Sequence, residues 1–179
     1  MNIVYEYSHL GGLEILKVRY SSILEEILTT VKSIKVPKTK ISQEKTRRGK
    51  LLYSPKKINA AFSNELRKLG FQEIKDHYNI EIPEYRTTIK SYKQIDFHKE
   101  KVLIEVQFGK YAFMFYDMAK FQYFYNEAKA NVGIEIVPCS RLKKCMSTGV
   151  SYGEQLIYDI ERPRRHFPAV PVYIILVDM

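Results

Sequence analysis

The chain has 179 residues and a formal net charge of +9. Its length and its 45% content of hydrophobic residues predict one globular domain, 1–179, with a sizeable core. No apolar run approaches the roughly 20 residues that a membrane-spanning helix needs, and the N-terminus lacks the basic and apolar regions of a secretory signal. The cysteines, Cys139 and Cys145, lack zinc-ligand spacing, so we expect free thiols, no zinc site and a cytoplasmic location.

The first third of the chain predicts one strand and two helices. Residues 3–7 are expected to form a strand. Ser22 and Glu25 form a capping-box pattern before apolar residues at helical spacing, and Pro37 ends this helix or follows it. A second apolar stripe, 58–69, is stopped by Gly70.

The positive charge is concentrated between these two helices. Segment 31–57 contains ten basic residues against one acid, Glu44, and leaves 19 basic and 19 acidic residues elsewhere. Such clustering favours a surface for nucleic acid, because each neutralised phosphate releases counterions. The alternative is a solvated, mobile basic loop without a partner, and a membrane surface is disfavoured because no amphipathic stripe is present. Its central basic residues are Lys45, Arg47, Arg48 and Lys50.

The rest of the chain mixes strands and helices. This mixture predicts an α/β (α+β) fold with a mixed central β-sheet flanked by helices. Loops are expected at 147–153, which is rich in small residues, and at 162–166, which is rich in arginine. The expected elements are a strand at 79–83, a hairpin of strands at 91–97 and 101–108, an aromatic helix at 117–129, and strands at 132–137 and 170–177.

The hairpin carries three polar residues, Asp96, Glu105 and Gln107, in otherwise apolar surroundings. An ionised Glu105 is costly to bury in such a strand without a partner. Strand alternation places Glu105 and Gln107 on one face, and a two-residue turn at 100–101 would set Asp96 directly opposite Glu105, with Cβ atoms roughly 5 Å apart. Carboxylates at that separation favour a shared divalent cation, as in metal-assisted phosphodiester hydrolysis.

Two of these patterns have simpler interpretations. The hairpin pattern also fits a sheet edge whose polar residues face the solvent. The aromatic residues of the 117–129 helix more often belong to a core or an interface than to a platform that stacks nucleic-acid bases.

The stretch Asp96-x8-Glu105-Val106-Gln107 resembles the active-site segment of the BglII/BstYI group of type II restriction endonucleases, members of the PD-(D/E)xK nuclease superfamily. Gln107 stands where most members carry lysine. The similarity is greatest to BstYI and spans nearly the whole chain. The other similar blocks are Tyr7–Glu14, Glu44–Thr46, Leu52–Pro55, Phe108–Tyr111, Gly133–Pro138 and Ser151–Tyr152.

The resemblance implies a homodimeric, magnesium-dependent endonuclease, without a nucleotide cofactor, that cuts palindromic duplex DNA around a GATC core. Purine-GATC-pyrimidine with four-base 5′ overhangs is the preferred site. Asp96 and Glu105 would be metal ligands with the Val106 carbonyl as a third, and Gln107 would orient the attacking water. Asn79 resembles a fourth active-site position, although a turn-forming asparagine is an equal alternative.

The resemblance also implies DNA contacts and a dimer. Lys110 follows the catalytic strand, and Ser147 and Thr148 match a loop near DNA in these enzymes, while Arg164 and Arg165 are further candidates from their charge. The aromatic helix is a plausible dimer interface, unless it packs wholly inside the monomer. A catalytically inactive DNA-binding protein and a non-restriction nuclease of the same fold remain as alternatives.

Overall fold

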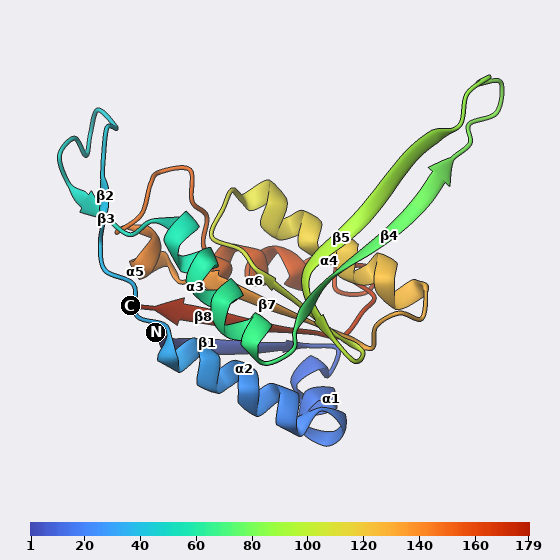
Figure 1. The fold of residues 1–179 in the computed structure, drawn as a ribbon, viewed down its shortest axis with the longest axis horizontal. Coiled ribbons are helices and arrows are strands. Elements are labelled where there is room, and N and C mark those ends of the chain that lie inside the picture. The colour runs from blue at the N-terminus through green and yellow to red at the C-terminus, as the bar shows by residue number, and fades with distance from the viewer.

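The computed structural model describes all residues, 1–179, and is built around one mixed β-sheet (Figure 1). Strands β6, β7 and β8 are parallel, whereas β1, β5 and β4 join the sheet in antiparallel pairings. The predicted mixed sheet flanked by helices is therefore confirmed. The six strands, in spatial order, are β1 (Asn2–His9), β8 (Val172–Asp178), β7 (Val132–Pro138), β6 (Val102–Val106), β5 (Ile89–Lys99) and β4 (Gln72–Ile80).

Helices cover both faces of this sheet and enclose a core of 41 buried hydrophobic residues. On one face, α3 packs through Phe62, whose ring centroid is 6.4 Å from that of Phe108. On the other face, α4 packs so closely that a Cβ atom at Gly133 would lie 2.6 Å from the Phe121 ring. The helices are α1 (Gly12–Arg19), α2 (Ser21–Ser33), α3 (Pro55–Lys68), α4 (Tyr111–Asn126), α5 (Ser140–Lys143) and α6 (Gly153–Glu161).

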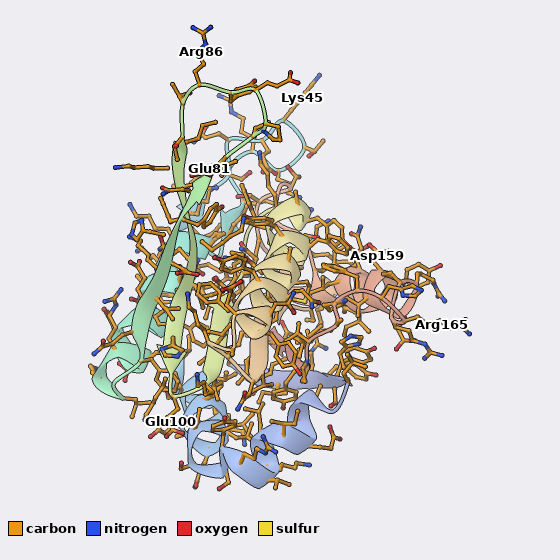
Figure 2. All side chains as sticks on the ribbon, turned by 90° about the vertical axis from the view of Figure 1, so that its right-hand side faces the viewer. Lys45, Glu81, Arg86, Glu100, Asp159 and Arg165 are labelled. Atoms are coloured by element: carbon orange, nitrogen blue, oxygen red, sulfur yellow. The ribbon has the colours of Figure 1, made fainter.

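Two segments project from the same side of this body (Figure 1). One is the basic loop, residues 38–52, which is closed by the short antiparallel strands β2 (Lys40–Ile41) and β3 (Leu51–Leu52). The other is the β-arm, residues 75–94, formed by the outer parts of β4 and β5. Lys45 of the basic loop and Arg86 at the tip of the β-arm reach the same end of the molecule, whereas Glu100 lies at the opposite end (Figure 2).

Several element boundaries differ from those predicted. The capping box at Ser22 is wrong, because α2 begins at Ser21 and has no side-chain cap. The aromatic helix begins at Tyr111, nearly two turns earlier than expected, and ends at Asn126. Helices α1, α5 and α6 were not predicted, since α5 has only four residues and α1 begins directly after two turn positions of positive φ, Leu10 and Gly11. No helix has the length and apolar character to cross a membrane.

Candidate functional site

The hairpin between β5 and β6 has the predicted register. Lys99 pairs with Val102 across a two-residue turn, and the pairing continues to Phe97 and Ile104. The pairing ends there, and the next residues in the same register are Asp96 and Glu105. Beyond this point β5 leaves β6 and continues into the β-arm, so these carboxylates lie at a fork between two strands.

A β-bulge lies at this fork. Between the pairs Gln72–His98 and Ile74–Ile95, β5 contains two residues where β4 contains one. Such bulges bend a strand and re-aim a side chain, and they are common beside active sites. The bulge leaves Asp96 exposed between two buried neighbours.

A depression of about 280 Å³ opens at the fork beside α3. Asp96 and Val106 line it together with polar residues of α3, including Asn59 and Ser63. The structure therefore brings together, at one opening, two of the three positions that the sequence analysis assigned as metal ligands.

Glu105 is 2% exposed and is the start of a buried cluster of charged side chains. The Nζ atom of Lys120, on α4, lies 2.5 Å from Glu105 Oε1 and 2.7 Å from Asp117 Oδ1. Gln107 Nε2 donates a hydrogen bond of 2.9 Å to Asp117 Oδ2. Glu135 is next to Glu105 in the parallel β6–β7 pairing and is fully buried, and neither of its carboxylate oxygens has a hydrogen-bond partner. We call Asp96, Glu105, Asp117, Glu135 and Lys120 the acidic cluster.

Burial and mutual repulsion raise the pKa values of these carboxyl groups. The pKa of Glu105 is raised to about 8 by burial first and by the negative charge of Asp117 second, against the opposing effect of Lys120. Burial also raises the pKa values of Asp117 and Glu135. Burial alone would lower the pKa of Lys120, but Glu105 and Asp117 override it and raise that pKa. The cluster therefore has more carboxyl groups than its single lysine can balance in their ionised form, and such perturbed pKa values are typical of functional sites.

The Gln107 side chain is fixed at both ends. Its amide nitrogen donates to Asp117, and its Oε1 faces Gly109 so closely that a Cβ atom there would lie 2.5 Å away. The absence of a side chain at Gly109 thus leaves room for the Gln107 carbonyl oxygen. With its nitrogen occupied, this amide can accept a hydrogen bond through Oε1.

The basic loop is fastened to the segment 145–148. Lys40 Nζ donates to Ser147 Oγ at 2.6 Å, and Arg47 Nη1 donates to the Met146 carbonyl at 2.6 Å. Glu44 Oε1 accepts from the backbone nitrogen of Thr148 at 2.9 Å and from its hydroxyl at 3.2 Å. Two groups of predicted DNA-contacting residues, one in each segment, are therefore neighbours in the structure.

The remaining predicted site residues fall at different distances from this region. Lys110 is exposed at the N-terminus of α4, beside the carbonyl of Gly109, which accepts a 2.9 Å hydrogen bond from the Ser151 nitrogen. Arg164 and Arg165 are not brought to the basic loop, and Arg165 lies on another side of the molecule (Figure 2). Asn79 is not brought to the cluster either, because it pairs with Lys90 in the β-arm and is exposed.

Comparisons with known proteins identify the family of this chain and its fold. The family model of restriction endonuclease BglII/BglIII matches residues 4–177. The chain belongs to this family. Its members are endonucleases that act on DNA, and the family resemblance seen in the sequence is confirmed. No curated protein sequence matches the chain.

Crystal structures of BglII share the fold of this family member. BglII complexed with a DNA 16-mer is 23% identical, with a TM-score of 0.78 over 100% of this chain and 79% of that chain. Free BglII is 19% identical, with a TM-score of 0.69 over 100% of this chain and 80% of that chain. The greater similarity to BstYI stays a prediction.

Three residues of the acidic cluster were missed from the sequence. Glu135 carried the same signal as Glu105, since both are single glutamates inside apolar strands. Asp117 and Lys120 lie three residues apart on α4, among aromatic neighbours. These two charged residues were the signal in the sequence that the helix has a polar side facing the sheet. Their convergence with Glu105 required knowledge of how α4 packs.

Proposed function

We propose that this family member is an active type II restriction endonuclease that hydrolyses phosphodiester bonds of palindromic duplex DNA in a magnesium-dependent reaction. Two observations at the β5–β6 fork carry this proposal. Asp96 and Val106 line one depression, and Glu105 and Gln107 are linked through Lys120 and Asp117 of α4. We propose purine-GATC-pyrimidine as the recognition sequence and four-base 5′ overhangs as the product ends, as implied by the resemblance to the BglII/BstYI group.

The donors at the fork fit a magnesium ion. Carboxylate and carbonyl oxygens are the ligands that this ion prefers, and the oxygens of Glu135, buried beside Glu105, have no hydrogen-bond partner in the protein. Asp96, Glu105 and the Val106 carbonyl would hold the ion. When bound, it would activate a water molecule and offset negative charge on the scissile phosphate. In the structure itself, no three acidic, histidine or cysteine side chains converge closely enough to hold a metal.

Side chains of the protein would orient the attacking water. Asp117 fixes the amide of Gln107, so that Oε1 can accept a hydrogen bond from the attacking water. This is a positioning role, because a neutral amide does not replace a lysine as a base. Asn79 is left out of this assignment, because it pairs with Lys90 in the β-arm.

Duplex DNA would lie between the basic loop and the β-arm. Both project from the side toward which β6 runs (Figures 1 and 2). Lys45, Arg48 and Lys50 are exposed on the loop and would contact phosphates, and Lys110 with Ser147 and Thr148 would lie nearer the bases. BglII, of the same fold, was crystallised with a DNA 16-mer.

A palindrome is read most simply by a two-fold dimer with one active site per strand. Helix α4 supports a homodimer, because its outer side exposes Phe113 and Tyr116 at 56% and 45% of their surface. Analytical ultracentrifugation tests this part of the proposal, and a monomer at all concentrations, with or without DNA, would contradict it.

The decisive test is digestion of unmethylated plasmid DNA with and without Mg²⁺, followed by sequencing of the product ends. Discrete, magnesium-dependent fragments with 5′-GATC overhangs would support the proposal and reveal the flanking bases. Cuts at unrelated or scattered positions would favour a nuclease of different specificity. Site-specific binding without any cleavage would favour an inactive DNA-binding protein.

A further inference from the structure

Lys120 occupies a position that a metal ion could also use. Its ammonium group is 2.5 Å from a carboxylate oxygen of Glu105 and 2.7 Å from one of Asp117, and the lysine side chain is only 14% exposed. Hard divalent cations bind between carboxylate oxygens in the same way. Glu105 is at once the proposed metal ligand and the ion-pair partner of this lysine.

Two other carboxyl groups around this position, those of Glu135 and Asp96, have no ion-pair partner. Both oxygens of Glu135 are buried without a hydrogen bond, next to Glu105 in the sheet. Asp96 lies beyond the last paired residues of the fork, where no ion pair with a lysine or arginine holds it. The acidic cluster thus has four carboxyl groups and one ammonium group, so a cation of higher charge would be held more strongly than the lysine.

We propose that Lys120 is a built-in counter-ion that a divalent cation must displace from Glu105 before the site is loaded. This inference rests on the proposed function, since it concerns the same metal site. Lys120 has a second partner already in place, because Asp117 lies three residues earlier on α4 and binds the same ammonium group. The side chain can therefore leave Glu105 and remain on Asp117.

Displacement has a measurable consequence for ion affinity. While Lys120 holds Glu105, an incoming ion competes with it, and the apparent affinity is reduced by the fraction of sites in which the lysine is bound. An uncharged side chain of similar length removes this competition. The protein without DNA should consequently bind divalent ions weakly, and the Lys120→Met variant should bind them more tightly.

The test is calorimetric titration of the DNA-free protein with Ca²⁺. Lys120→Met should bind Ca²⁺ about tenfold more tightly than the unaltered protein. Lys120→Arg keeps the charge and should bind as weakly as the unaltered protein. Lys99→Met removes a lysine that pairs with Glu26 on the other face of the sheet and should leave Ca²⁺ affinity unchanged. Equal or weaker binding by Lys120→Met would overturn the inference.

A second measurement avoids dependence on the folding of that variant. Acetylation of Lys120 in the unaltered protein, followed by mass spectrometry, should increase severalfold at saturating Ca²⁺, because an ammonium group held by Asp117 alone is more accessible than one held by two carboxylates. Unchanged or decreased labelling would overturn the inference. Tighter Ca²⁺ binding by Lys120→Met without plasmid cleavage by the unaltered protein would uphold the inference and remove the proposed function. Plasmid cleavage by the unaltered protein, without tighter Ca²⁺ binding by Lys120→Met, would support the proposed function and overturn the inference.

Discussion

The acidic cluster and the basic loop carry opposite charges and hold them in opposite ways. The cluster draws its side chains from β5, β6, β7 and α4, and three of its carboxyl groups are buried. The basic loop exposes its charges and is fastened to the body by a few hydrogen bonds to segment 145–148. Buried charges change each other's pKa values strongly, whereas exposed charges act through long-range attraction that salt screens. The chemistry should therefore depend on the cluster and the affinity for DNA on the loop.

The largest expected effect separates cleavage from binding. Asp96→Asn or Glu105→Gln should reduce the cleavage rate about a thousandfold or more, because each removes a ligand charge at the fork. DNA affinity should change by less than about threefold, since neither carboxylate is assigned to DNA contact. Plasmid digestion and fluorescence anisotropy measure the two effects.

The matched control for these variants is Glu100→Gln, at the turn at the far end of the same hairpin. It should preserve both cleavage and binding. Full cleavage by Asp96→Asn or Glu105→Gln would remove the site assignment altogether.

Removing the positive charges of the basic loop should weaken DNA binding at least about tenfold and make the binding less sensitive to salt. Replacing Lys45, Arg47, Arg48 and Lys50 with alanine should lower the slope of log affinity against log salt by about 0.9 for each phosphate that the loop no longer neutralises. Lys17→Ala with Arg19→Ala, on α1 away from both projections, is the control. An unchanged salt slope in the loop variant would show that the loop does not touch phosphate.

The next effect concerns the stability of the metal-free protein as a function of pH. The pKa of Glu105 is about 8 in the folded protein, above its ordinary value of 4.5. The folded protein therefore binds more protons than the unfolded chain between these values, and its stability should fall as the pH rises from about 5 to 8.

Glu105→Gln should flatten this dependence and reduce the fall by an amount on the order of 1 kcal/mol. The fall should not vanish, because burial raises the pKa values of Asp117 and Glu135 in the same direction. Urea denaturation at pH 5.5, 7 and 8.5 provides the measurement. A stability that rises over this range, in the protein with Glu105 intact, would contradict the raised pKa.

The smallest expected effect is at the second basic segment. Arg164→Ala with Arg165→Ala should change DNA affinity less than about twofold, because Arg165 lies on a different side from the basic loop (Figure 2). A reduction in affinity as large as that of the loop variant would mean that the DNA path also covers the loop after α6.

The sequence predicted those features that depend on near neighbours. The turn length was enough to predict the β5–β6 register, which the structure shows as far as Phe97 and Ile104, and helical spacing identified α3. The positions of Asp117, Lys120 and Glu135 depend on the packing of α4 on the sheet and on the β6–β7 pairing, which join residues 15 to 30 positions apart. Asn79 was a candidate from the resemblance alone, and the alternating pattern around it did not show that β4 extends into a projecting arm, where Asn79 pairs with Lys90.

The bulge in β5 also determines which face of the sheet each side chain of this strand points to. Outside the bulge, Lys93 points toward α4 and donates to the Tyr116 hydroxyl, and two residues further on, Ile95 keeps that side. At the bulge β5 contains one extra residue, and Asp96 lines the depression beside α3. An insertion or deletion of a single residue in β5 would turn one face of the β-arm over relative to Asp96, whereas a change by two residues would preserve both faces. We therefore expect a one-residue insertion in β5 to disturb the packing of the β-arm more than a two-residue insertion.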